Sequence, residues 1–176
     1  MRSDRPRFDV LGELAALRRY ARALLRDGTD SEDLVHDALV RAYERRSQFR
    51  PDGNLRSWLL SILHNVFVDR LRSRLAETSR MDRLSALSDD ALAPPQEHAV
   101  RLAEVWAAFH SLPDEQRAAL HLVAIEGLSY QDAASALDIP LGTLMSRIGR
   151  ARAALRAFDS ADPGRPARFR IVGGPS

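Results

Sequence analysis

The sequence predicts an all-α protein made of two small helical domains joined by a flexible linker. Three observations support this fold class. Apolar residues recur at intervals of three and four through most of the chain, which is the period of an amphipathic helix. Runs of alternating apolar and polar residues, which half-buried strands produce, are almost absent. Residues 77–96 are rich in Ser, Asp, Ala and Pro, a composition typical of a linker between domains.

The composition narrows the class of protein. A chain of 176 residues has room for one ordinary domain or two small ones, and without cysteine it can form neither disulfides nor thiolate metal sites. No signal peptide or apolar run of membrane-spanning length is recognisable, so we expect a cytoplasmic protein with no membrane insertion. The net charge is only +2. Arginines outnumber acids over residues 10–80 and acids dominate 81–100, which favours a localised nucleic-acid face.

Residues 10–76 are expected to form the first domain, after an N-terminal extension at 1–9. Its first helix covers 10–27, because apolar periodicity runs through that segment and Gly28 interrupts it. Arginines occupy most of the opposite side of this helix. The side expected to be buried carries Leu11, Leu14, Leu17, Ala21 and Leu24.

Two further helices complete the first domain. The second begins at the acidic run 30–33, since carboxylates are favourable at a helix N-terminus, and continues to about Gln48. A loop at 49–54 separates it from a third helix over about 55–75. Trp58, near the start of the third helix, is interpreted as an anchor of the core rather than as a platform for stacking bases.

Residues 97–158 are expected to form the second domain, and the Pro/Gly/Arg-rich tail 159–176 to be disordered. The domain begins with a helix near 100–111. Another helix is started by residues 113–115, Pro-Asp-Glu, and ends near Gly127.

A helix-turn-helix is predicted at the end of the second domain. Its first helix covers Tyr130–Leu137, with Ser129 as N-cap and Asp132 completing a pair that resembles a capping box. Pro140 cannot continue that helix, and a second helix begins near Leu141. In proteins with this motif the second helix lies in the DNA major groove.

The second helix of the motif has two distinct faces. One is an apolar stripe formed by Leu144, Ile148, Ala151 and Leu155. The other carries hydroxyl and guanidinium groups, which contact base edges and phosphates, at Thr143, Ser146, Arg147 and Arg150. A helical hairpin that binds no DNA is the alternative interpretation, and the arginine-bearing face makes it the less favoured one.

Two segments taken together resemble a bacterial RNA polymerase sigma factor of the sigma-70 family, extracytoplasmic-function (ECF) subfamily. They are SEDLVHDALVRAYERRSQFRPDGNLRSWLLSILHNVFVDRLRSR (31–74) and LPDEQRAALHLVAIEGLSYQDAASALDIPLGTLMSRIGRARAALR (112–156). The resemblance implies a promoter-recognition subunit. Its first domain, sigma region 2, would bind core RNA polymerase and open the −10 element. Its second, sigma region 4, would bind the −35 element as duplex.

The resemblance also assigns roles to individual residues. Core polymerase binding is implied for Asp33, Asp37, Arg41 and Glu44. Contacts with the −10 element are implied for Asn54, Arg56, Ser61, Asn65, Arg70 and Arg72. Contacts with the −35 element are implied for Thr143, Ser146, Arg147, Arg150 and Arg152. An anti-sigma factor is a further implied partner, and no cofactor is expected.

Three positions depart from the family's usual residues. His36 stands where glutamine is usual, Met145 where a basic residue is frequent, and Gly149 where the residue is often bulky or polar. The latter two bear on which −35 sequence the chain prefers.

Other functions are less consistent with the sequence. An enzyme is not indicated, because there is no glycine-rich phosphate loop or nucleophile motif and the histidines at 36, 64, 98, 110 and 121 lack metal-ligand spacing. A stand-alone helix-turn-helix regulator would need a dimerisation element, and no heptad stretch provides one. A sigma-like decoy that binds an anti-sigma factor would not need both the polymerase and −10 surfaces, which this chain keeps.

Overall fold

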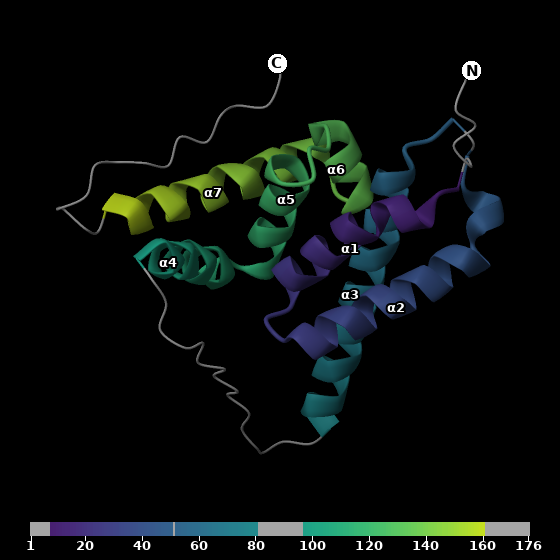
Figure 1. Cartoon of the computed structure of the whole chain (residues 1–176), viewed down its shortest axis with the longest axis horizontal. Helices are drawn as coiled ribbons and strands as arrows, with labels where there is room; N and C mark the ends of the chain where they lie inside the picture. The colour runs from purple at the N-terminus through teal and green to yellow at the C-terminus, as the bar shows by residue number, and fades with distance from the viewer. Residues whose placement is uncertain (1–7, 51, 81–96, 161–176) are drawn as a thin grey trace.

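The computed structural model describes residues 8–50, 52–80 and 97–160. Most of the expected linker, nearly all of the expected tail and residues 1–7 of the N-terminal extension lie outside this described part. Within it the chain forms seven α-helices, one short 3₁₀ turn and no strand, which confirms the all-α prediction (Figure 1). The elements are α1 (Val10–Leu24), α2 (Gly28–Glu44), the 3₁₀ turn η1 (Arg46–Gln48), α3 (Leu55–Arg80), α4 (Glu97–Ser111), α5 (Asp114–Ala124), α6 (Tyr130–Ala136) and α7 (Leu141–Ser160).

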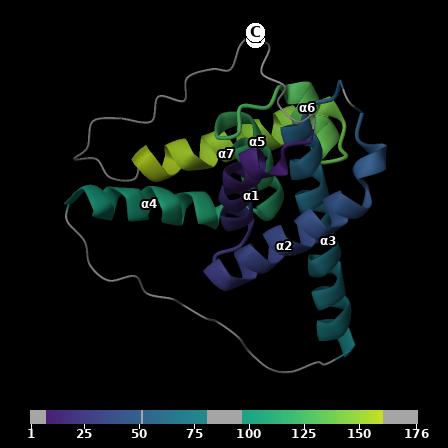
Figure 2. The same cartoon turned by 45° about the vertical axis from the view of Figure 1, so that its right-hand side comes forward.

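Helices α1, α2 and α3 form the first half of the molecule. Helix α1 packs on both α2 and α3, which also contact each other. The chain turns sharply between α1 and α2 because Leu25 is extended and Asp27 caps α2, accepting hydrogen bonds from the backbone N–H of Thr29 and Asp30 at 2.7 and 3.1 Å. The C-terminal part of α3 projects away from the other helices (Figures 1 and 2).

Helices α4 to α7 form the second half, in which α5 and α6 both pack on α7. Ser129 caps α6 as predicted, because its Oγ accepts from the backbone N–H of Asp132 at 3.0 Å. The α6–α7 turn requires a left-handed residue, Asp138, with φ of 52°. The stripe predicted for α7 is buried at Leu144, Ile148 and Ala151.

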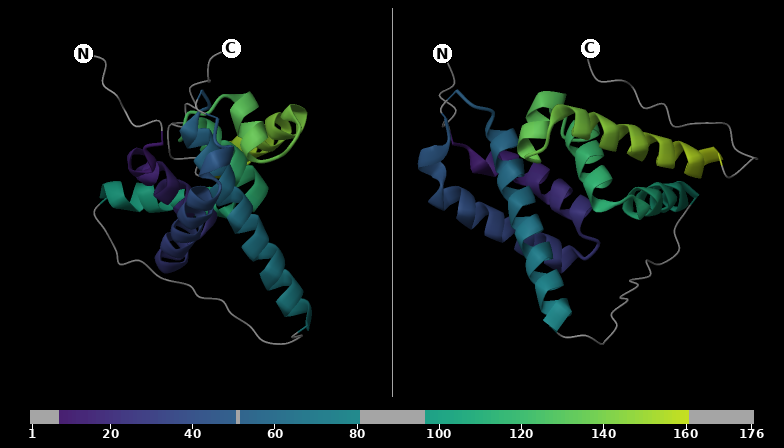
Figure 3. Two further views of the ribbon diagram at one scale, coloured as in Figure 1. Left: turned by 90° about the vertical axis from the view of Figure 1, so that its right-hand side faces the viewer. Right: turned by 180° about the vertical axis from the view of Figure 1, so that it is seen from behind.

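The two halves pack against each other, which the sequence does not predict. Helix α1 lies beside α5, and α3 contacts α6 (Figures 1 and 3). Buried apolar side chains of both halves belong to one continuous cluster. Tyr20 of α1 is at its centre, fully buried, with its ring stacked on that of His121 at 5.4 Å between centroids and its hydroxyl 3.0 Å from Nδ1 of His64.

Arg117 on α5 provides polar contacts across the same boundary. Its guanidinium is almost fully buried and donates hydrogen bonds to the carbonyl oxygens of Leu24 on α1, at 3.3 Å, and of Leu112, at 2.8 Å. In return, Arg26 donates to the carbonyl oxygen of His110 at 3.1 Å. Carbonyl groups at the C-terminal ends of α1 and α4 are therefore satisfied by arginines.

The structure corrects several predicted boundaries and one core position. Helix α3 continues to Arg80, five residues beyond the predicted end, because residues 76–80 contain no helix breaker. Helix α2 begins at Gly28, before its acidic run, because Asp27 provides the cap. Leu11 is 83% exposed rather than buried, and its neighbours Val10 and Leu14 pack partly against the core in its place. Trp58 packs against the core, as expected, with Phe8 and Phe49 around its ring.

Two features that the described residues lack bear on function. No helix there is both long and apolar enough to cross a membrane. No group of three or more His, Asp or Glu side chains in that part is arranged to hold a metal ion.

Candidate nucleic-acid interface

Helix α7 is held rigidly by its buried face, so its opposite face is fixed relative to the rest of the second half. Leu144 and Ala151 are fully buried, and Ile148 between them is 2% exposed. The turn before the helix is closed by hydrogen bonds from Ile139 N–H to the carbonyl oxygen of Ala134, 3.0 Å, and from Leu144 N–H to that of Pro140, 3.1 Å. This is the rigid two-helix arrangement that a DNA-reading helix requires.

Fewer of the residues predicted for the −35 element are exposed on α7 than the sequence suggests. Ser146 and Arg150 both lie on it, and Arg150 Nη2 donates to Ser146 Oγ at 2.8 Å. The hydrogen bond joins exposed groups one helical turn apart, so base edges or phosphates can replace it at little cost. Thr143 is half-buried at the edge of this face, near the N-terminus of the helix.

Arg147 and Arg152 do not share that face. The side chain of Arg147 is only 20% exposed and forms an ion pair with Glu115 of α5, Nη2 to Oε2 2.8 Å. Arg152 is also half-buried, and its Nε is buried without a hydrogen-bond partner in the described part of the chain. Of the five residues predicted for the −35 element, two are thus exposed and one is half-buried at the edge of the face. The other two, both arginines, are turned toward the protein.

The face of α3 predicted for the −10 element is turned toward the second half. Asn65, Val68 and Arg72 line a cleft of about 650 Å³ whose other wall includes Glu115 and Arg147. Asn65 is exposed within it, with its amide available to a ligand. Helical spacing does not predict that another part of the chain faces these three residues.

His64 lies in the same cleft and is neutral there. Burial, and then the positive charge of Arg147, lower the pKa of His64 from 6.5 to about 4. Its Nδ1 meets the buried hydroxyl of Tyr20. His64 therefore adds no positive charge to the cleft at neutral pH.

Three other residues predicted for the −10 element, Asn54, Arg56 and Ser61, make contacts within the protein near the start of α3. Asn54 Oδ1 accepts from the backbone N–H of Ser57 at 3.1 Å, which caps the helix. Arg56 forms an ion pair with Glu13 of α1, Nε to Oε2 2.6 Å. Ser61 donates to the carbonyl oxygen of Trp58 at 2.7 Å. Asn54 and Arg56 thus hold the start of α3, whereas the Ser61 bond lies within the helix. Sequence spacing alone does not distinguish these structural contacts from contact with DNA.

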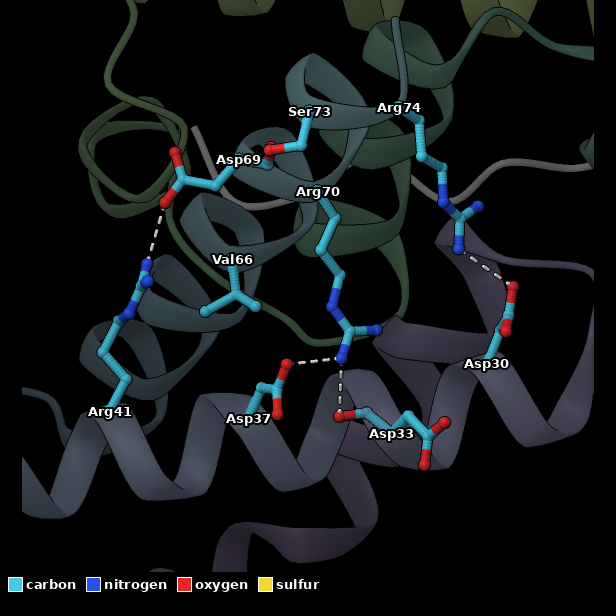
Figure 4. A pocket seen from close by; sticks show the side chains of 9 residues that line it. All are labelled: Asp30, Asp33, Asp37, Arg41, Val66, Asp69, Arg70, Ser73 and Arg74. Atoms are coloured by element: carbon cyan, nitrogen blue, oxygen red, sulfur yellow. Dashed lines mark hydrogen bonds and ion pairs between the residues drawn. The ribbon is translucent and has the colours of Figure 1, made fainter. Parts of the chain in front are cut away.

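The residues predicted to bind polymerase lie on α2 beside a row of charges on α3 (Figure 4). Arg70 donates to the carboxylate of Asp37 and, at 3.1 Å, to the carbonyl oxygen of Asp33. Arg41 pairs with Asp69, Nη1 to Oδ2 2.9 Å. Arg70, predicted for the −10 element, thus lies on this surface and away from Asn65.

Asp33 and Glu44 differ from the other two residues of the predicted polymerase surface. Both are exposed. No side-chain hydrogen bond or ion pair reaches either carboxylate from the residues the structure describes. Figure 4 shows the Asp33 carboxylate turned away from Arg70. Their charges therefore remain open to a partner.

Comparison with known proteins matches both halves of the chain. Residues 12–76 match the family Sigma-70 region 2, and residues 102–155 match Sigma-70, region 4. The ECF RNA polymerase sigma factor EcfG of Rhodopseudomonas palustris is 37% identical over 156 residues, spanning 89% of this chain and 86% of its own length. This chain belongs to the ECF family of RNA polymerase sigma factors.

Solved structures agree with this assignment. The sigma factor RpoE from Bartonella quintana, in complex with the anti-sigma factor NepR, is 34% identical with a TM-score of 0.76, and the likeness covers 88% of this chain and 96% of that one. CnrH, in complex with the cytosolic domain of CnrY, is 31% identical with a TM-score of 0.63, over 87% of this chain and 86% of that one. Helices α1 to α3 of this sigma factor thus carry region 2, and its helix-turn-helix belongs to region 4.

Proposed function

We propose that this sigma factor binds core RNA polymerase through α2 and directs transcription initiation in the cytoplasm by contacting the −10 and −35 promoter elements. The observation that carries the proposal is the pairing of the two family regions in one chain. A stand-alone regulator requires a helix-turn-helix and a dimerisation element, but has no need of region 2. A transcription initiation factor requires both regions, because one holds the separated strands and the other holds the duplex.

The −35 contact is assigned to α7. Ser146 and Arg150 are exposed side by side. A hydroxyl can donate to or accept from any base edge, and a guanidinium fork suits guanine. Arg147 serves as a phosphate contact in this scheme, after exchanging Glu115 for the DNA backbone.

The −10 contact is assigned to the α3 face around Asn65. Holding an unpaired base requires a polar group that both donates and accepts, together with a cleft that excludes the partner strand. The Asn65 amide supplies that polar group, and it is exposed on this face of α3. Since α5 and α7 residues form the other wall, the two halves have to move apart before a DNA strand can enter.

Core polymerase is the agent proposed to separate the halves. Docking of α2 through the exposed carboxylates of Asp33 and Glu44 fixes region 2 on the polymerase. The polymerase then holds region 4 at a set distance from region 2. The second promoter contact thereby becomes intramolecular and gains a high effective concentration. An anti-sigma factor is the proposed antagonist, and the solved relative RpoE in complex with the anti-sigma factor NepR supports that partner.

Promoter binding measured with and without core enzyme tests the function. A promoter would first be selected from genomic fragments by run-off transcription with core polymerase. We expect the purified chain alone to bind duplex DNA at about 10⁻⁴–10⁻⁶ M without sequence preference. Tight and specific binding should appear only with core enzyme. Nanomolar specific binding by the chain alone would instead support a stand-alone regulator.

A further inference from the structure

Met145 is an apolar side chain displayed on the part of α7 that faces solvent. It is 53% exposed, in the same helical turn as Ser146 and one turn before Arg150. Scattered apolar residues on a protein surface are ordinary and need no explanation. Met145 differs from them because it lies on the exposed side of the helix assigned to the −35 duplex.

Glycines stand on both sides of Met145 along the helix, three residues before it and four after it. A Cβ added at Gly142 or at Gly149 would meet nothing within 4 Å. Neither glycine is therefore required by close packing inside the free protein. The Met145 thioether stands beside two patches of bare backbone, and nothing at those positions limits how closely that edge of α7 can approach another molecule.

The chemistry of Met145 restricts what it can recognise in DNA. It has no charge for a phosphate, and its sulfur is only a weak hydrogen-bond acceptor. Among the groups that base pairs display in the major groove, the thymine C5 methyl is the apolar one. A flexible, polarisable thioether adapts well to such a small apolar target.

We propose that Met145 is a specificity-determining residue that contacts a thymine methyl in the −35 element. In this arrangement Gly142 and Gly149 allow the backbone of α7 to come close to the base edges. Ser146 and Arg150 supply hydrogen bonds, and Met145 supplies preference for an A·T pair. The inference rests on the proposed binding of the −35 duplex by α7.

Replacement of single thymines by deoxyuridine tests this contact, because it removes the C5 methyl and leaves base pairing unchanged. Each thymine of the −35 element, on either strand, is replaced in turn, and binding to holoenzyme is measured by competition. For one position we expect the affinity of wild-type holoenzyme to fall about fourfold, the effect of one buried methyl group. Holoenzyme carrying Met145→Ala should bind the thymine and deoxyuridine promoters equally.

Two matched variants separate apolar contact from simple length. Met145→Leu keeps an apolar side chain and should keep the preference for thymine. Met145→Gln has a similar length but a polar end, and should abolish that preference. If Met145→Ala holoenzyme remains as sensitive to deoxyuridine as wild type, Met145 does not make the contact.

Gly149→Ala tests the close approach of the helix. Because the added Cβ meets no atom of the protein, the variant should fold and its thermal midpoint should rise, since alanine is the better helix former. We expect it nevertheless to weaken promoter binding by the holoenzyme. Unchanged promoter affinity in this variant would overturn the role given to the glycines.

The controls distinguish failure of this inference from failure of the proposed function. If wild-type holoenzyme does not distinguish the selected promoter from one with a scrambled −35 element, the proposed reading of that element fails. If it does distinguish them, yet no thymine-to-deoxyuridine replacement weakens binding, only the assignment of Met145 fails.

Discussion

Arg19 on α1 and Glu126, directly after α5, form a two-point ion pair that joins the halves of the molecule. Arg19 Nε lies 3.0 Å from Oε1 and Nη2 lies 2.8 Å from Oε2 of the carboxylate, whose second contact is Nε2 of His121 at 3.1 Å. The Glu126 side chain is fully buried, whereas that of Arg19 is half-exposed. Burial alone would raise the pKa of Glu126, but hydrogen bonds from His121 and Arg19 outweigh it and hold that pKa below its ordinary value.

Replacing Arg19 is expected to destabilise the contact between the halves. Arg19→Ala leaves a buried carboxylate with one partner, which should lower the free energy of unfolding by about 1–3 kcal/mol. Arg18→Ala is the matched control, because both side chains of the Arg18–Glu32 ion pair are exposed. Loss of this ion pair should cost less than about 1 kcal/mol. Urea unfolding of both variants provides the comparison. Equal destabilisation would show that burial of Glu126 adds nothing.

Acid is expected to destabilise the fold through His110. Its ring is buried against Trp106, 4.6 Å between centroids, and burial followed by the charges of Arg117 and Arg26 lowers its pKa from 6.5 to about 4, against the opposing charge of Asp114. A lowered histidine pKa favours folding above pH 6.5, and this stability is lost as the pH falls from 6.5 toward 4.

The pH effect can be measured with a ring that does not titrate. Between about pH 7.5 and 5 a pKa difference of this size is worth about 2 kcal/mol. His110→Phe keeps the aromatic contacts, so its stability should fall less than that of wild type over that interval. The stability of His36→Asn, at an exposed position on α2, should fall as much as that of wild type. Parallel decreases in all three proteins would exclude His110 as the cause.

The open carboxylate of Asp33 is expected to contribute to polymerase binding without contributing to stability. A hydrogen bond to a charged group is worth about 1.5–3 kcal/mol, so Asp33→Ala should weaken binding of core enzyme by that order. Its free energy of unfolding should stay within about 0.5 kcal/mol of wild type, as is usual for exposed sites. Asp52→Ala, which removes an exposed acid before α3, is the control for net charge. The docking assignment is wrong if both variants bind core enzyme equally.

Asn65 is expected to act on the opened −10 element alone. Asn65→Ala should reduce the permanganate reactivity of promoter thymines, which reports strand opening, and leave protection of the −35 element intact. Ser73→Ala is the matched control, because Ser73 lies on the other side of α3, next to α2. Equal binding of a pre-melted promoter bubble by Asn65→Ala and wild-type holoenzyme would contradict this role.

The sequence predicts the local structure of this chain well because local structure depends on near neighbours. The cap of α6 by Ser129 and the buried stripe through Leu144 follow from intervals of three and four residues. The contact between the halves does not, because Arg19 and Glu126 are 107 residues apart and each has the pattern of an ordinary surface charge. Periodicity likewise places Arg147 near Arg150, but only the packing of α5 decides that Arg147 turns inward to Glu115.

The last prediction compares Arg150, which is exposed on α7, with Arg147, which is paired with Glu115. Arg150→Ala should reduce discrimination between the specific and a scrambled −35 element by about 1–3 kcal/mol for each bidentate hydrogen-bond pair to a base that the substitution removes. Arg147→Ala should weaken holoenzyme binding to both sequences alike, since a phosphate contact carries no sequence information. The two variants remove the same charge from the same helix, so a general electrostatic effect would make them identical. Equal weakening by Arg150→Ala on specific and scrambled promoters would therefore show that Arg150 also contacts only the DNA backbone.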